Sequence, residues 1–340
     1  MGSVKDLEVL EEPTDKKAGL GRFVFSDRYS VFDWGEMPDH IKNKGRSLCL
    51  IGAWFFERLK GMGIKSHYKG LVENGQVRSI NNVGSPPDTL EVKLLRVLKP
   101  RLNKGHYDYS LYKTQTGNFL IPLEVIYRNS LPPSSSVFKR LNNNSLKLKD
   151  IGLNKIPEPG QKLENPLLDV STKLEEIDRY MDWKEAQNIS GLTDQELSRI
   201  KEITLIINQL ITDEVQQLGL QHEDGKIEFG MDENRQIVLV DVLGTPDECR
   251  FTYKGIPVSK EAARIFYRKT EWFKEVEEAK KKDKVNWKKR VSSPPPPLSS
   301  RLQELIPHLY QSFCNQITKK QWFNVPSLEE VMAGIDEALK

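Results

Sequence analysis

The sequence predicts a globular fold that mixes strands and helices and begins with a small β-rich lobe. Its 340 residues are 38% hydrophobic and 29% charged, which is the balance of a folded globular protein rather than a disordered chain. Short β-like runs alternate with turns over residues 1–35, whereas residues 46–63 carry apolar side chains at helical spacing. A chain of this length holds one large domain or two modest ones with a substantial core.

Strand and helix signals of the N-terminal half support this prediction. Gly61 is expected to end the helix over 46–63. Residues 130–170 are expected to be loop-rich, because they contain the stretches SLPPSSS and NKIPEPGQ. The strand signals lie at 7–10, 22–25, 90–98 and 119–128.

A long helix and a hairpin are predicted next. The helix spans 194–218, with Thr193 as its N-cap and Glu196 completing a capping box. The runs 226–230 and 236–242 flank a polar turn, as a β-hairpin requires.

The C-terminal third is expected to be helical around a proline tract. A helix begins near Ser259 and continues into the charged run 275–284, which is interpreted as a solvated helix face. The tract 292–300 holds four consecutive prolines and predicts a polyproline connector. A last helix is predicted over 301–318.

Charge, cysteine usage and the length of the apolar runs argue against several classes of protein. A net charge of +3 does not indicate a nucleic-acid-binding protein. Three widely spaced cysteines predict neither a disulfide framework nor a zinc site, and favour a reducing compartment. No apolar run approaches ~20 residues, so no membrane span is expected, and the N-terminus lacks the pattern of a signal peptide. We therefore expect a cytoplasmic protein.

The hairpin carries carboxylates where apolar strands make them costly. Lys226 and Glu228 share one face of the first strand because strand side chains alternate, and Asp241 ends the second. Two carboxylates and an ammonium on one surface suit a divalent cation that holds phosphate. An ordinary ion-pair ladder on an antiparallel sheet explains the pattern equally well.

Other polar clusters allow a binding role or a plain structural one. The turn before Lys5 could cradle phosphate. Ser30 and Asp33 could bind a polar molecule or cap the following loop. The serine-rich turn 134–136 could form an anion pocket with Arg128, and Arg250 beyond Asp247 could fork onto a phosphate.

Taken in order, these stretches resemble the SAICAR synthetase family, the phosphoribosylaminoimidazole-succinocarboxamide synthases of purine biosynthesis. The resemblance covers essentially the whole chain. It rests on GSVKDLEV, SDRYSVFD, KNKG, IKSHY, PLEVIYRN, STKLEEID, GKIEFG and VLVDVLGTPDECRF. It implies an α+β fold of two lobes related to ATP-grasp and kinase-like architectures, with antiparallel sheets and packed helices.

The resemblance also implies the domain organisation and the reaction. Residues 1–128 would form a β-rich ATP-binding lobe, 129–290 a larger α/β lobe with the metal and nucleotide-substrate site, and 291–340 the proline connector and a helical segment. With ATP and Mg²⁺, L-aspartate would be ligated to carboxyaminoimidazole ribonucleotide (CAIR) through an acyl phosphate, giving SAICAR, ADP and phosphate. The expected partners are these small molecules, with no nucleic acid or membrane; a homo-oligomer is allowed.

The resemblance assigns roles to individual residues. Catalytic roles fall to Lys226, Asp33 and Lys173. ATP would be bound by Lys5, Glu124, Glu228 and Asp241, of which Glu228 and Asp241 would hold magnesium. The substrates would be bound by Arg128, Ser134 or Ser136, Arg250, Ser30, Asp178 and Asp247.

The chain also departs from the family pattern. Ser3 replaces a lysine of the phosphate-binding turn, Val242 replaces a glutamate after Asp241, and the stretch 259–300 is longer than in compact members. These departures leave two rival functions open: a non-catalytic nucleotide-binding relative, and an ATP-dependent ligase for another carboxylate.

Overall fold

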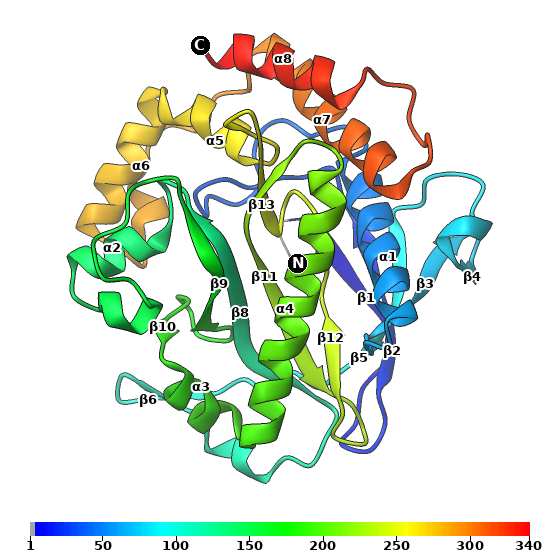
Figure 1. Ribbon diagram of the computed structural model, residues 1–340, viewed down its shortest axis with the longest axis vertical. Helices are drawn as coiled ribbons and strands as arrows, with labels where there is room; N and C mark the ends of the chain where they lie inside the picture. The colour runs from blue at the N-terminus through cyan, green and yellow to red at the C-terminus, as the bar shows by residue number, and fades with distance from the viewer. Residues whose placement is uncertain (1–3) are drawn as a thin grey trace.

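Two antiparallel sheets lie side by side, and helices pack on and around them, as the computed structural model of residues 4–340 shows (Figure 1). The first sheet has five strands in the order β1-β2-β5-β3-β4. Its strands are β1 Lys5–Glu11, β2 Gly19–Phe25, β3 Tyr68–Glu73, β4 Gln76–Arg78 and β5 Thr89–Leu94. Helix α1 (Lys44–Gly61) packs against β2, β3 and β5.

The second sheet has seven strands, and the long strand β11 lies at its centre. Along β11, β8 pairs on one side, whereas β13 and β12 pair in turn on the other. The strands are β8 Phe119–Leu131, β9 Gln161–Thr172, β10 Tyr180–Met181, β11 Gln221–Met231, β12 Ile237–Val240, β13 Cys249–Tyr253 and β14 Ile256–Pro257. The strands β6 (Arg101–Asn103) and β7 (His106–Asp108) form a separate small hairpin.

Helix α4 (Asp194–Gln216) covers one face of the second sheet (Figure 1). Thr193 caps it, and Glu196 completes the capping box, as predicted. Its buried apolar residues recur every three or four positions, so one face of the helix packs on β8 and β11. The remaining helices are α2 Ser136–Asn142, α3 Trp183–Ser190, α5 Glu261–Arg268, α6 Glu271–Lys282, α7 Ser300–Thr318 and α8 Leu328–Leu339.

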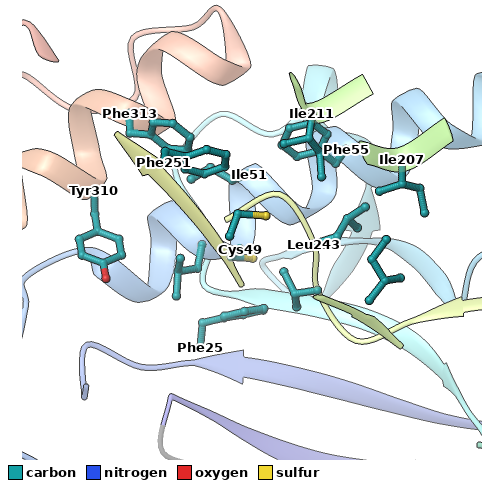
Figure 2. Close-up of a cluster of buried hydrophobic side chains, with 14 of the residues drawn as sticks. Phe25, Cys49, Ile51, Phe55, Ile207, Ile211, Leu243, Phe251, Tyr310 and Phe313 are labelled. Atoms are coloured by element: carbon teal, nitrogen blue, oxygen red, sulfur yellow. The ribbon is translucent and has the colours of Figure 1, made fainter. Parts of the chain in front are cut away.

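The hydrophobic core joins elements that lie far apart in the chain (Figure 2). Phe55 of α1, Ile211 of α4, and Phe313 of α7 all lie in this core and are fully buried. Phe251 of β13 stacks on Phe313 with ring centroids 5.3 Å apart. Helix α7, which follows the proline tract, is therefore part of the core and not an appendage.

A short bridge connects the two sheets and sets their relative position. Ser66, just before β3, pairs with Leu239 of β12, and the backbone N–H of His67 donates to the Leu239 carbonyl at 2.9 Å. This bridge brings the end of β12, and with it Asp241, against the first sheet.

Several expectations from the sequence are wrong in detail. The stretch 130–170 contains more regular structure than expected, because β9 begins at Gln161 and α2 lies within it. The helix expected from Ser259 is two helices, since Thr270 caps a new one, and α8 was not expected. Gly61 is the last residue of α1; the glycine that takes the left-handed conformation there is Gly63, with φ 77°.

The proposed lobe boundary at residue 128 falls within β8, which pairs with both β9 and β11. The three-part division of the chain thus stays a prediction. Over residues 4–340, no helix is both long and apolar enough to cross a membrane.

Candidate active site

A network of acidic and basic side chains lies where β8, β9 and β11 run together. Glu124 of β8 and Glu228 of β11 are direct partners in the register of the sheet. Lys173 Nζ lies 2.5 Å from Glu228 Oε1 and 3.0 Å from Glu124 Oε1. Lys226 Nζ lies 3.1 Å from Glu124 Oε1, so the two ammonium groups share that carboxylate. The predicted face of β11 is therefore joined by Lys173, which lies just after β9 and is close to Glu228 only in space.

Asp241 completes this network from the side of the first sheet. It follows β12 with φ 60°, a left-handed conformation that aspartate tolerates better than most residues. Its carboxylate pairs with Lys5 of β1, and His67 Nε2 lies 3.1 Å from its backbone oxygen. Lys5 and Asp241, predicted from distant motifs, are thus in direct contact.

Burial and mutual repulsion perturb the two carboxyl groups that were predicted to hold a metal. Burial and the charge of Asp241 raise the pKa of Glu228 to about 8. Burial would also raise the pKa of Asp241, but the charge of Lys5 outweighs it and lowers the pKa. Each carboxylate therefore disfavours the charged form of the other, and a cation near both would relieve this conflict.

The two carboxyl groups fit a magnesium ion that takes its other ligands from phosphate and water. Within residues 4–340, no three or more His, Cys, Asp and Glu side chains form a ready-made metal site. Magnesium is commonly held by one or two carboxylates, with phosphate oxygens and water supplying the remaining positions. Glu228 and Asp241 meet that requirement, and nothing more is needed from the protein.

A second cluster is built from two arginines around one aspartate. Asp224 of β11 is the register partner of Arg128 in β8 and of Arg250 in β13. Arg128 Nη1 lies 3.2 Å from Asp224 Oδ2, and Arg250 Nε lies 2.7 Å from Asp224 Oδ1. Asp224 therefore holds both guanidinium groups on the same face of the sheet.

Both candidate serines contact these arginines. Arg250 Nη1 donates to Ser134 Oγ at 2.8 Å, and Arg128 Nη2 donates to Ser136 Oγ at 3.1 Å. The sequence left the choice between the two serines open, and each one lies beside a different arginine.

A cavity of about 260 Å³ joins the two clusters. The face of β11 that carries Asp224 and Lys226 also carries Glu228, because these residues are two apart along the strand. The lining includes Glu124, Arg128, Asp178, Asp224, Lys226, Asp247 and Arg250.

Asp247 lines this cavity, but its carboxylate is already bound by the buried side chains of Lys44 and Tyr310. Lys44 Nζ lies 3.0 Å from its Oδ2, and the Tyr310 hydroxyl donates to its Oδ1 at 2.7 Å. Burial would raise the pKa of Asp247, whereas the charge of Lys44 lowers it to about 2. Its contacts are those of a residue that anchors the segment before Arg250, and its role toward substrate stays a prediction.

Ser30 and Asp33 come from the loop after β2, on the open side of the site. The Asp33 side chain is 93% exposed, and Ser30 Oγ accepts a hydrogen bond from the Gly35 N–H at 3.3 Å. Burial and the negative charges of Glu124 and Asp33 raise the pKa of Asp178, against Lys226 and Lys173. Asp178 thus lies within electrostatic reach of Asp33 and of the lysine network.

The two substitutions among the departures from the family pattern have different outcomes. Val242 does not face the carboxylate network: it is buried in the core, and a Cβ on Gly52 of α1 would lie 2.8 Å from its Cγ1. Ser3 and Gly2 lie outside the described residues.

The sequence reasoning missed Asp224, Asp169 and Arg140. Asp169 of β9 accepts from both Arg128 and Arg140, which fixes the buried Arg128 from a second side. Asp224 had a usable signal, because it precedes Lys226 by two residues and so shares its strand face. Asp169 had no such signal, because the polar first half of β9 predicts a loop. Arg140 of α2 had none either.

A buried network of carboxylates and lysines that shares a cavity with paired arginines defines a protein that binds highly charged, phosphorylated small molecules. Comparison with known proteins makes this specific. The sequence profile of the SAICAR synthetase family matches residues 12–285. An Archaeoglobus fulgidus protein is 50% identical over 340 residues, all of both chains, and carries the name phosphoribosylaminoimidazole-succinocarboxamide synthase provisionally.

Solved structures agree on the fold. The SAICAR-synthase of Saccharomyces cerevisiae, complexed with SAICAR, superposes with a TM-score of 0.62 at 21% identity over 95% of each chain. A SAICAR synthetase in complex with ADP gives 0.60 at 22% identity, over 94% of this chain and 97% of its own.

The chain belongs to the SAICAR synthetase family and is a ligase of purine biosynthesis. The predicted α+β fold of antiparallel sheets with packed helices is confirmed. The relation to ATP-grasp proteins stays a prediction.

Proposed function

We propose that the protein ligates L-aspartate to CAIR with ATP, giving SAICAR, ADP and phosphate through an acyl phosphate. Family membership supports the reaction class. One structural relative is solved with ADP and another with SAICAR. These complexes support a nucleoside triphosphate as co-substrate and an imidazole ribonucleotide in the cavity.

The observation that carries this proposal is the arginine pair held by Asp224 in the same cavity as Lys226. Arg128 and Arg250 bring two positive charges and Asp224 brings one negative charge, so these three cavity-lining side chains together are positively charged. A preorganised pair of guanidinium groups with net positive charge suits the 5′-phosphate of a ribonucleotide. The serine hydroxyls beside them offer further hydrogen bonds.

The carboxylate network would serve the triphosphate. Lys5, Glu124, Glu228 and Asp241 would bind ATP, and Glu228 and Asp241 would hold magnesium. When bound, this ion would neutralise charge on the β- and γ-phosphates.

The lysines supply the remaining electrostatic stabilisation. Lys226 and Lys173 sit among carboxylates whose charges raise both lysine pKa values despite burial, so both stay protonated. Their ammonium groups would stabilise negative charge as the γ-phosphoryl group passes to the CAIR carboxylate. Their partial burial limits water, which protects an acyl phosphate from hydrolysis before the aspartate nitrogen attacks.

The open side of the site would bind the reacting ends of the substrates. Asp33 and Ser30 would lie near the imidazole carboxylate, and Asp178 near L-aspartate. We place the reaction in the cytoplasm, which three buried cysteines without disulfides support.

The test is a set of incubations that each omit one component. ADP should form only when ATP, magnesium, L-aspartate and CAIR are all present, and SAICAR should form in equal amount. ATP binding without turnover would favour the non-catalytic relative. ADP formation with a different carboxylate, but not with CAIR, would favour the other ligase. The burial of Val242 away from the network supports an active site over a decayed one.

A further inference from the structure

The loop that carries Asp33 has an unusual backbone conformation. Phe32 and Asp33 are consecutive residues in the left-handed region, with φ of 55° and 61°. Residues other than glycine adopt this region rarely, and two in a row persist only where the surroundings hold them. The question is what holds this loop.

Aromatic side chains of α6 and of the following 3₁₀ turn (Trp287–Arg290) pack on the loop. Phe32 packs on Phe273 with ring centroids 4.5 Å apart. Trp34 meets Trp272 edge-on at 5.4 Å and Trp287 at 6.0 Å. This packing fixes the apolar residues on either side of Asp33, but it does not reach the carboxylate itself, which is exposed.

Lys280, near the end of α6, is the polar contact at that point. Its Nζ donates to the Phe32 carbonyl at 2.8 Å and lies 3.8 Å from Asp33 Oδ2. The same ammonium group lies 4.6 Å from the Trp287 ring centroid, so its own position is fixed by packing. One cation therefore binds both the backbone and the side chain of the left-handed pair.

We propose that Lys280 is a positioning residue for Asp33, holding the left-handed turn so that the Asp33 carboxylate projects toward the substrates. This inference rests on the proposed function, in which Asp33 contacts the reacting end of CAIR. It assigns a role to α6, whose lysine run the sequence alone marks only as a solvated face.

The first arm of the test measures the loop without reference to activity. The amides of Trp34 and Gly35 are protected by bonds to the Val31 carbonyl and Ser30 Oγ. In Lys280→Met, these amides should exchange hydrogen at least several-fold faster than in the unmodified protein. Lys281→Met is the matched control, because its side chain is exposed on the same helix. Unchanged exchange in Lys280→Met overturns the proposal.

The second arm measures kinetics in a double-mutant cycle. Lys280→Met should lower kcat about tenfold, the effect of losing one charge-assisted hydrogen bond, and leave the KM for ATP unchanged. Lys280→Arg keeps the charge and a donor, so it should retain most of the activity. In an Asp33→Asn background, Lys280→Met should cause no further loss.

The outcomes separate this inference from the proposed function. Multiplicative losses in the double variant, or full activity of Asp33→Asn, overturn the positioning role. No ADP formation by the unmodified protein is instead a failure of the proposed function. The exchange arm would then still decide whether Lys280 holds the loop.

Discussion

Lys44 Nζ lies 3.0 Å from Asp247 Oδ2, and the two side chains are almost completely buried. Lys44 also donates to the Arg28 carbonyl at 3.2 Å, and Asp247 accepts from Tyr310 of α7. The pair therefore connects α1, the loop after β2 and helix α7 to the segment that leads into Arg250. Figure 2 shows Tyr310 at the edge of the core that these elements share.

Removing one member of this pair should destabilise the protein strongly. Lys44→Met leaves the Asp247 charge buried without its partner, and we expect the free energy of unfolding to fall by about 3–5 kcal/mol. Urea unfolding measures it. The double variant Lys44→Met with Asp247→Leu should recover most of this loss, because an apolar pair needs no compensation. A single variant within about 1 kcal/mol of the unmodified protein would show that the pair is not an anchor.

Glu228→Gln should abolish ligation without unfolding the protein. Burial and Asp241 already disfavour the charged carboxyl, so a neutral amide of the same size should be tolerated. Calorimetry should show that magnesium no longer strengthens ATP binding. Glu277→Gln, on the exposed surface of α6, is the control. Normal turnover of Glu228→Gln at limiting magnesium would remove Glu228 from the metal site.

Arg250→Ala should weaken binding of CAIR more than binding of ATP. A charge-assisted contact contributes ~1.5–3 kcal/mol, so the KM for CAIR should rise about tenfold or more. Arg128→Ala should do the same but also lower stability, since its side chain is 3% exposed and neutralises Asp169 and Asp224. Steady-state kinetics with each substrate varied in turn gives both values. Equal losses for ATP and CAIR would place the arginines at the triphosphate.

Acidification should unfold the protein partly through His222. Burial lowers the pKa of His222 to about 3, whereas the same group in the unfolded chain titrates near 6.5. Below that pH the unfolded state binds the extra proton, so the free energy of unfolding falls as pH decreases, by about 1.4 kcal/mol per unit.

His222→Gln lacks the titrating group, so its stability should depend less on pH. Relative to this variant, the unmodified protein should lose about 2 kcal/mol between pH 6.5 and 5. Denaturant midpoints across this range measure the difference. Parallel pH profiles for the two proteins would show that His222 is accessible to protons in the folded state.

Local patterns predicted much of the fold, whereas contacts between distant elements were beyond them. The capping box at Thr193 and the hairpin before Asp241 are determined by short-range chemistry, and both match the structure. Strand β9 was missed because its first half is polar and exposed, so it shows no alternating pattern. Helix α8 carries a local signal that could have predicted it, because Ser327 and Glu330 form a capping box at its start.

The site shows the same limit. Lys226 and Glu228 could be placed on one strand face, but Lys173, the partner of Glu228, lies just after β9, and Lys5 comes from the other sheet. Only the sheet order brings these four side chains together. Val242 shows the converse limit. It is adjacent to Asp241 in the sequence, but it is buried in the core and not in the site.

Val242→Glu tests that correction. The side chain is 5% exposed and packs toward α1, so a glutamate there would bury a carboxylate without a partner. We expect the free energy of unfolding to fall by about 3 kcal/mol at pH 7, with no gain in magnesium-dependent ATP binding. Because burial raises the pKa of such a carboxyl, the folded variant binds more protons than its unfolded chain, and its deficit should shrink as pH falls toward 5. Val242→Gln has nearly the same shape but no charge, so its deficit should not depend on pH. Wild-type stability of Val242→Glu, together with tighter ATP binding, would mean that position 242 faces the site after all.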